Sequence, residues 1–462
     1  MEHLIKEVVR FTEHAADGGD FTSSAIREIW NLIDDSGRNL NVYRGILTLL
    51  HFSKFAEFPD TTVEHLATDE TFLKCLSLSK GDASLSPEEV GRMFSNILEL
   101  PGENARDRDI LAGCFYGSLW SLMNDPANLD QATEYGLAIL GAAFTLDHLS
   151  IRQKLKLPEN KAKVITLSGS GKKEIKLLNI SSMAAIVIAA TGRKIGENIV
   201  VEKTVARATS STTGSSDIFE LAGVNLNLPV EEMAEISLAT KIGLFDINAI
   251  VPQLNHVYDG RLHNVQVFAG LVGGAAIVNP VDADLINYGL TRGSTRLCLA
   301  ILRDLYPGKN ILVLQGKDAH GTPVMDQVST TGDTELAQII DGKATVRQIA
   351  PKDFGFAFRS SESIETTGNQ KDNLDQFIRI LLGRGDKELE QAVAMEAALN
   401  LFGIEVVDDL RAGAELALAT IDSGAGIDVL RDLVVYSGGD LQKFNGLVNR
   451  NATVSDRMAR AI

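Results

Sequence analysis

The sequence predicts an α/β protein, in which a small N-terminal helical domain precedes a larger α/β domain with a central sheet flanked by helices. Over roughly the first third of the chain, apolar residues recur at the three- and four-residue spacing of helices. From Lys163 onward, short apolar runs typical of strands alternate with helical patterns. The chain has 462 residues, 45% hydrophobic and 23% charged, which is enough to build a sizeable core in about two or three domains.

Helices are expected throughout the N-terminal part. Leu4 and Val8 share one helical face, and Ser86-Pro87-Glu88-Glu89 is a capping box with proline at the first helical position. Helical patterns continue over 110–123 and 132–144. Three scattered histidines are expected at the surface or in packing rather than as ligands: His14, His51 and His65.

The α/β part shows both kinds of element. Strands are predicted at 164–167, 311–315 and 346–349, and helices at 231–239, 294–305 and 388–402. The glycine-rich run 270–280 is expected to form a buried turn against the sheet, and a polar tail, 440–462, closes the sequence. The predicted domains are a helical extension over 1–80, a helical domain over 81–160, an α/β domain over 161–433 and a C-terminal extension over 434–462.

A glycine-rich loop follows the first predicted strand. In Ser168-Gly169-Ser170-Gly171 the glycines would leave backbone amide hydrogens exposed to an anionic ligand. Asn179, Ser181 and Ser182 precede an apolar helical run, where helix amides and hydroxyls can hold phosphate. Lys203 and the hydroxyls of 209–216 add a second loop of donors, so the stretch indicates a ligand with two anionic ends. An ordinary turn is the alternative.

The loop is not a Walker loop. That motif needs a glycine where Thr166 stands and a serine or threonine where Lys173 stands.

The net charge of the chain disfavours two classes of binding partner. The chain carries 44 Lys and Arg against 61 Asp and Glu, a net charge of −17, which disfavours nucleic acid and anionic lipid. Its apolar runs are too short to span a bilayer, and its start does not resemble a signal peptide. The three cysteines, Cys75, Cys114 and Cys298, are not spaced as metal ligands, which favours a cytoplasmic location.

Two acidic residues are candidate metal ligands, because a ligand with two anionic ends commonly binds together with a divalent cation. Asp326 follows the strand predicted at 311–315, and Asp217 ends the hydroxyl-rich loop. A turn or a helix cap is the alternative role for each. His320, in the loop before Asp326, is expected to be solvated.

These motifs resemble those of anthranilate phosphoribosyltransferase and its relatives, the glycosyltransferase group that includes the pyrimidine nucleoside phosphorylases. The resemblance covers about residues 85–432. The family's Gly-Thr-Gly-Gly-Asp loop corresponds to Gly169-Ser170-Gly171-Lys172-Lys173, and its Asn-x-Ser-Thr to Asn179-Ile180-Ser181-Ser182. Its Lys-His-Gly-Asn-Arg corresponds to Lys203-Thr204-Val205-Ala206-Arg207, followed by an intact Ser-Ser-x-x-Gly-Ser-x-Asp at 210–217. Its Asp-Glu metal pair corresponds to Asp326-Gln327.

The resemblance implies an enzyme that transfers the ribose 5-phosphate group of phosphoribosyl pyrophosphate, or of another phosphorylated sugar, to an aromatic or amine acceptor. It also implies Mg2+ as cofactor and a homodimer formed through the helices of 85–150. The implied metal ligands are Ser181, Asp326 and Gln327. The implied substrate-binding residues are Gly169, Ser170, Gly171, Lys172, Lys173, Asn179, Ser181, Ser182, Lys203, Arg207 and Ser211.

The sequence departs from the family at several of these positions. Lys172 and Lys173 replace a glycine and an aspartate, and they could either grip a phosphate or fill the pocket. Gln327 replaces a carboxylate of the metal pair, and Thr204 and Ala206 replace the residues that meet anthranilate. Two interpretations follow: a transferase with an acceptor other than anthranilate, which is favoured, and a non-catalytic binding or assembly protein.

Overall fold

The computed structural model describes residues 2–35, 39–82, 84–158, 162–171, 175, 177–208, 213–258, 279–360, 362, 364–366 and 368–459. The chain forms two compact units. One comprises the described residues of Met1–Ile151 and Gln253–Gly273, and the other those of Arg152–Pro252 and Gly274–Ile462. Within the described residues, no helix combines the length and the apolar character that membrane crossing requires.

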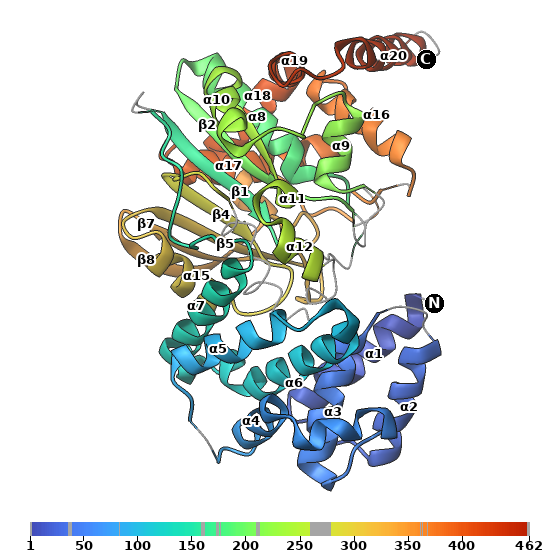
Figure 1. Ribbon diagram of the computed structural model, residues 1–462. Helices are drawn as coiled ribbons and strands as arrows, with labels where there is room; N and C mark the ends of the chain where they lie inside the picture. The colour runs from blue at the N-terminus through green and yellow to red at the C-terminus, as the bar shows by residue number, and fades with distance from the viewer. Residues whose placement is uncertain are drawn as a thin grey trace. The chain divides into compact units, whose positions relative to one another are not determined.

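The first unit is helical, as the sequence predicts (Figure 1). Its helix α5 begins with the predicted capping box, in which Ser86 and Glu89 each accept from the other's backbone amide. Helices α3 and α6 approach closely at Gly45 and Gly113. A Cβ on Gly45 would lie 1.9 Å from the Ile110 carbonyl oxygen, so this close approach requires glycine. Its helices are α1 (Glu2–Ala16), α2 (Ser23–Asp35), α3 (Asn41–Phe55), α4 (Glu70–Ser79), α5 (Pro87–Leu98), α6 (Ala105–Asn124) and α7 (Leu129–Thr145), with the short α12 (Pro252–Tyr258) further along the chain.

The second unit is built around one mixed sheet. Within the described residues the strand order is β3-β2-β1-β4-β5-β7-β8, with β6 paired to β5. The pairs from β3 to β5 are parallel, whereas β6, β7 and β8 are antiparallel to their neighbours. The strands are β1 (Lys163–Gly169), β2 (Ile199–Val205), β3 (Ile242–Asp246), β4 (Leu285–Gly289), β5 (Asn310–Lys317), β6 (Pro323–Met325), β7 (Thr334–Ile340) and β8 (Lys343–Ile349).

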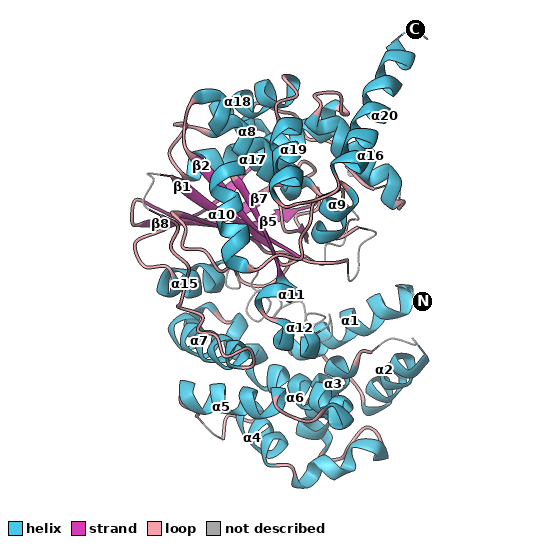
Figure 2. Cartoon of the chain, turned by 45° about the horizontal axis from the view of Figure 1, so that its top comes forward, coloured by secondary structure: helices cyan, strands magenta, loops and turns pink. Residues whose placement is uncertain are grey.

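Helices cover both faces of this sheet. Figure 2 shows α8, α17 and α18 on one side and α15 on the other. The apolar run 183–190 lies inside α8 and is buried, because α8 packs against the sheet on one side and against α17 and α18 on the other. The helices are α8 (Ile180–Ile195), α9 (Ser215–Leu221), α10 (Val230–Thr240), α11 (Ile247–Ile250), α15 (Thr295–Leu305), α16 (Gln370–Leu381), α17 (Lys387–Gly403), α18 (Leu410–Asp422), α19 (Gly426–Tyr436) and α20 (Leu441–Ala459).

The strands and helices predicted in the α/β part are present in the structure. The strands predicted at 164–167, 311–315 and 346–349 lie within β1, β5 and β8, and the predicted helices correspond to α10, α15 and α17. Most of the buried turn predicted at 270–280 lies outside the described residues. The domain boundaries at 80, 160 and 433 stay predictions.

The C-terminal segment is more ordered than a polar tail. It forms α20, whose Phe444 and Leu447 are buried. The side-chain amide of Asn451 donates to Asp375 of α16 at 2.9 Å, and Lys443 donates to the backbone carbonyl of Glu220 in α9 at 2.9 Å. Phe444 and Leu447 are three residues apart, which is helical spacing, but most residues around them are polar, so composition alone suggested a tail.

A buried carboxyl group lies on β2, the second strand from one edge of the sheet. Glu202 of β2 is fully buried, and Ser237 of α10 donates to its Oε1 at 2.7 Å. A Cβ on Gly243 of β3 would lie 2.2 Å from Oε2, so the glycine makes room for the carboxyl. Burial raises the pKa of Glu202 to about 8, because desolvation disfavours the ionised form, although the Ser237 hydrogen bond acts in the opposite direction.

We expect Glu202→Gln to remove a pH dependence of stability. The folded pKa lies above the ordinary 4.5, so the folded protein keeps a proton that the unfolded chain releases, and stability falls as pH rises from about 4.5 to 8. Relative to the glutamine variant, the wild type should lose about 2 kcal/mol of unfolding free energy between about pH 6 and pH 8. Urea unfolding of both proteins at the two pH values measures it, and parallel pH dependences would contradict the assignment.

Candidate functional site

The candidate site lies where the strand order reverses. The chain builds β1, β2 and β3 outward in one direction, then returns to place β4 and β5 on the other side of β1. In open parallel sheets, ligands bind beyond the carboxyl ends of the strands at such a switch point. The loop that begins at Gly169 follows β1, and Gly289 ends the neighbouring β4. The predicted glycine loop therefore lies at the edge of the sheet where such sites occur.

Asp326 occupies the space that these glycines leave. It follows β6, is buried, and accepts the backbone amide of Gly171 through Oδ2 at 2.7 Å. A Cβ on Gly169 would lie 2.4 Å from that same oxygen, and one on Gly289 would lie 1.9 Å from the Asp326 carbonyl oxygen. Both strand ends must therefore be glycine for the Asp326 segment to pack over them.

The amides of the loop point inward, which corrects the prediction of an exposed amide cradle. The Ser170 amide donates to the carbonyl of Gly289 at 2.8 Å, and the Gly171 amide donates to Asp326. The Ser170 hydroxyl accepts from the amide of Thr291 at 2.9 Å, and the Thr291 hydroxyl donates to the Gly171 carbonyl at 2.5 Å. The loop and the segment after β4 are therefore joined by several hydrogen bonds.

The start of α8 carries the second group of predicted residues. Lys203 of β2 is 3% exposed, and its Nζ donates to the hydroxyl of Ser181 at 3.2 Å. Ser182 is also buried, and its hydroxyl has no hydrogen-bond partner within the described part of the chain. The structure thus brings a buried ammonium and two hydroxyls to the positive end of a helix dipole. Asn179 instead donates to the Thr213 carbonyl at 3.3 Å.

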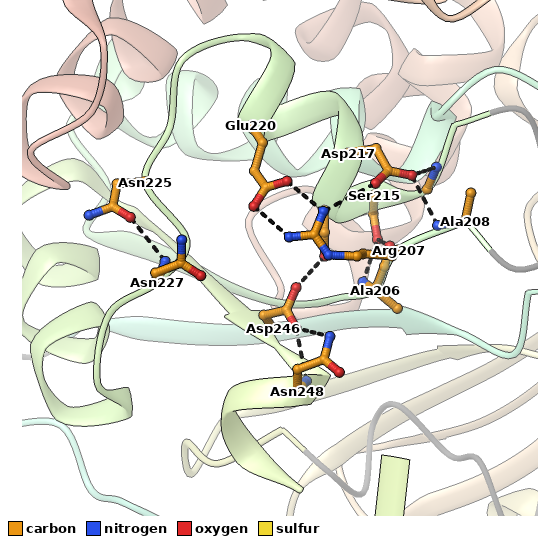
Figure 3. Close-up of polar contacts among 12 residues, drawn as sticks. Ala206, Arg207, Ala208, Ser215, Asp217, Glu220, Asn225, Asn227, Asp246 and Asn248 are labelled. Atoms are coloured by element: carbon orange, nitrogen blue, oxygen red, sulfur yellow. Dashed lines mark hydrogen bonds and ion pairs between the residues drawn. The ribbon is translucent and has the colours of Figure 1, made fainter. Parts of the chain in front are cut away.

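Hydrogen bonds join the two ends of the hydroxyl-rich loop after β2. Asp217 accepts the amides of Ala208 and Gly214 at 3.0 and 2.8 Å, so it acts as a helix cap, the alternative weighed against metal binding. The Ser215 hydroxyl accepts the amide of Ala206, and the Ser216 hydroxyl donates to Asp246. Figure 3 shows the contacts of Asp217 with Ala208 and of Ser215 with Ala206. These two hydroxyls are therefore turned toward the protein.

Arg207 is held by acidic neighbours in the same view. Its guanidinium makes two hydrogen bonds with Glu220, at 2.7 and 2.8 Å, and lies 3.6 Å from Asp217 (Figure 3). The hydrogen bonds to Glu220 raise the pKa of Arg207. A bidentate pair of this kind occupies one N–H edge of the guanidinium, so the predicted contact of Arg207 with substrate would have to compete with it or use the remaining N–H groups.

Several predicted positions lie outside the described residues. They are Lys172, Lys173 and Ser211.

The predicted metal ligands supply few charges. Asp326 is the one carboxylate among them, and Gln327, 1% exposed, has a side-chain oxygen with no hydrogen-bond partner in the described structure. The described residues contain no group of three His, Cys, Asp or Glu side chains arranged to hold a metal. Such a donor set fits an Mg2+ ion that brings phosphate oxygens with it, and does not fit one held by protein ligands alone.

Sequence reasoning missed the contribution of the segment after β4. Thr291 is buried and binds both Ser170 and Gly171. Glu396 of α17 accepts the amide of Val328 at 3.0 Å and so anchors the segment that follows Gln327. The run Asn287-Tyr288-Gly289 ends an apolar strand with glycine, which is the signal that could have located Thr291.

The mixed sheet, with a change of strand order beside β1 and helices on both faces, defines an α/β protein. Comparison with known proteins specifies the family. The chain belongs to the glycosyl transferase family, whose α/β-domain model matches residues 161–427, and is thus a member of a family of transferases.

Individual relatives agree with this assignment. The chain is 29% identical to anthranilate phosphoribosyltransferase of Persephonella marina over 361 residues, which cover 77% of this chain and 96% of the relative. It is 34% identical to the enzyme of that name from Glaesserella parasuis over 276 residues, covering 58% and 76%.

Solved structures share the fold. Anthranilate phosphoribosyltransferase from Thermus thermophilus superposes with a TM-score of 0.59 at 22% identity, covering 80% of this chain and 99% of that one. The Saccharomyces cerevisiae enzyme, in complex with PRPP and Mg, gives a TM-score of 0.62 at 17% identity, covering 81% and 99%. These matches confirm the predicted fold class, a helical N-terminal part followed by an α/β domain.

Substitution of Asp326 should separate its structural role from its charge. We expect Asp326→Ala to free the Gly171 amide and speed its hydrogen exchange by at least about tenfold, since losing a buried hydrogen bond costs about 1–3 kcal/mol. Asp326→Asn keeps an acceptor oxygen of the same shape and should stay near wild type. Exchange mass spectrometry on peptides covering Ser168–Gly171 measures the effect, and equal exchange in the alanine variant would rule out this anchoring role.

Proposed function

We propose that this chain transfers the ribose 5-phosphate group of phosphoribosyl pyrophosphate to an aromatic or amine acceptor. The observation that carries the proposal is the buried Lys203 ammonium, which contacts Ser181 at the N-terminus of α8. The lysine ammonium and the helix N-terminus both carry positive charge, and together they favour a bound anion at this place. The names of the relatives, and the PRPP complex of the yeast enzyme, support phosphoribosyl pyrophosphate as that anion.

The residues would act mainly through electrostatics. The transfer breaks the bond between the sugar carbon and the diphosphate oxygen and forms a bond to the acceptor. Lys203 and the hydroxyls of Ser181 and Ser182, at the positive end of the α8 dipole, would bind phosphate oxygens and orient the sugar. These donors are fixed by the fold before the substrate arrives, so little reorganisation is needed during the reaction.

Magnesium has a specific place in this proposal. The Asp326 carboxylate lies against the glycine loop, and it would repel a diphosphate there unless a cation lay between them. Asp326, the side-chain oxygen of Gln327 and the Ser181 hydroxyl would hold the ion. When bound, Mg2+ would neutralise the charge that develops on the departing diphosphate.

The acceptor is proposed to differ from anthranilate. Thr204 and Ala206 stand where the family that the sequence resembles has the histidine and asparagine that meet anthranilate. Ala206 has no polar side-chain group, and its backbone amide is already bonded to Ser215. These positions therefore offer fewer donors to a carboxylate on the acceptor.

A non-catalytic binding or assembly protein is the second candidate. One observation favours it: the amides of Ser170 and Gly171 are satisfied by Gly289 and Asp326 rather than directed outward. A member of the family that had lost its chemistry would be free to close its loop in this way.

Ligand-induced stabilisation tests the proposal. Phosphoribosyl pyrophosphate with Mg2+ at about 100 times its Kd should stabilise the folded protein by about 2.7 kcal/mol, seen as a rise in Tm. Lys203→Met should abolish most of the rise. Lys194→Met is the matched control, because Lys194 lies exposed at the other end of α8, where it donates to the Ala419 carbonyl.

A Tm that does not change at millimolar ligand would exclude the transferase and leave the binding protein. Where binding occurs, release of pyrophosphate with a panel of aromatic amines that includes anthranilate identifies the acceptor, and turnover with anthranilate itself would contradict the altered specificity.

A double substitution of Lys172 and Lys173 distinguishes the two roles considered for these lysines. Replacing Lys172 with glycine and Lys173 with aspartate should weaken phosphoribosyl pyrophosphate binding if their ammonium groups contact a phosphate, and strengthen it if they fill the pocket. We expect weakening of about tenfold, since one charged hydrogen bond contributes about 1.5–3 kcal/mol. Isothermal titration measures the Kd, and an unchanged Kd would remove both lysines from the site.

A further inference from the structure

A second group of chemically reactive side chains lies in the helical unit. Ser23, the first residue of α2, has its Oγ 2.8 Å from Nε2 of His51 in α3. The other ring nitrogen of His51, Nδ1, lies 2.8 Å from the backbone carbonyl oxygen of Glu57. His51 is completely buried, whereas Ser23 is half-buried and reaches the surface. None of these residues belongs to the proposed transferase site.

The hydrogen-bond directions follow from the chemistry of the partners. A carbonyl oxygen can only accept, so Nδ1 must carry the proton in its contact with Glu57. In the neutral imidazole this leaves a lone pair on Nε2, which accepts from the Ser23 hydroxyl. The result is a nucleophile hydrogen-bonded to a base, and a base oriented by a third group.

Ser23 lies among charged groups of both signs, and its hydroxyl is also within 3.4 Å of Oε1 of Glu57. Its Oγ lies at the N-terminus of a 13-residue helix that has no acidic residue in its first turn. Nε of Arg27 approaches the same oxygen at 3.4 Å, and the Arg27 guanidinium pairs with Glu57 at 3.1 Å. The Glu57 carboxylate lies 3.9 Å from Nε2 of His51, where it would stabilise the imidazolium formed when Ser23 loses its proton.

Aromatic side chains border this group. The ring of Phe55 lies 4.9 Å from the His51 ring, and Phe55 contacts Phe21 edge to face at 6.2 Å. Both phenylalanines are only half-buried, so part of each ring remains accessible beside the polar group. An acyl chain or an aromatic acid would find apolar contact there.

We propose that Ser23 is a nucleophile activated by His51 and that the helical unit accepts an acyl group from an activated carboxylic ester. Ser23 Oγ attacks the ester carbonyl while its proton passes to His51 Nε2. Collapse of the tetrahedral intermediate expels the alcohol, which takes the proton from His51, and leaves an ester on Ser23. Water, deprotonated by the same nitrogen, then releases the acid and regenerates the serine.

Covalent labelling of the full chain tests this proposal directly. A fluorophosphonate probe, followed by peptide mass spectrometry, should place an adduct on Ser23, and p-nitrophenyl acetate should give a burst of about one equivalent of p-nitrophenolate. Ser23→Ala should abolish both signals. Ser24→Ala is the matched control, because Ser24 is the next, exposed hydroxyl of the same helix, bonded to Thr22 rather than to a histidine, and it should label as wild type.

His51→Gln should slow the labelling on the order of 100-fold, the contribution typical of a general base. Circular dichroism and the Tm show whether this buried substitution still folds. If it does not, the wild type decides: Ser23 labelled at least ten times faster than Ser24 supports the proposal. A wild type labelled no faster at Ser23 than at Ser24, or a folded His51→Gln variant that labels at the wild-type rate, overturns it.

Discussion

The hydrogen bond from the Gly171 amide to Asp326 is the contact on which the candidate transferase site depends. It joins the loop after β1 to the segment after β6, two parts of the chain more than 150 residues apart. It can form only because Gly169 and Gly289 have no side chain, since a Cβ at either position would overlap Asp326. The ends of β1 and β4, the Asp326 carboxylate and the glycine loop thus pack together at the switch point of the sheet. The position of each depends on the others.

The loop after β2 depends on a different set of contacts, which reach the end of the chain. Asn373 of α16 donates to the Thr213 hydroxyl at 3.0 Å, and Asn179 donates to the Thr213 carbonyl. Two residues along α16, Asp375 accepts from Asn451 of α20, whose side chain is buried. Lys443 of α20 also reaches the end of α9 through the Glu220 carbonyl. Helix α20 therefore contacts both α9, which follows the hydroxyl-rich loop, and α16, which binds Thr213 of that loop.

Particular residues show what sequence reasoning could and could not predict. Runs such as 164–167 and 388–402 were predicted correctly as strand and helix, because their period is set by neighbours in sequence. The capping box at Ser86 is equally local. The partners of the glycine loop were not predictable in this way, since Asp326 and Thr291 meet Gly171 only after the sheet has formed. The Ser23–His51 pair was missed for the same reason: 28 residues separate the two, and His51 alone was considered, with an expected surface or packing role.

The charges at the carboxyl edge constrain the ligand further. Lys203 of β2 pairs in register with Leu167 of β1, while Asp326 packs over the end of β1 two residues later. A buried ammonium and a buried carboxylate therefore both belong to the carboxyl edge of the sheet. A simple anion would suit Lys203 and be repelled by Asp326, whereas a simple cation would suit only Asp326. A phosphate that carries its own divalent cation satisfies both, and for this reason a metal–diphosphate complex fits the edge better than either ion alone.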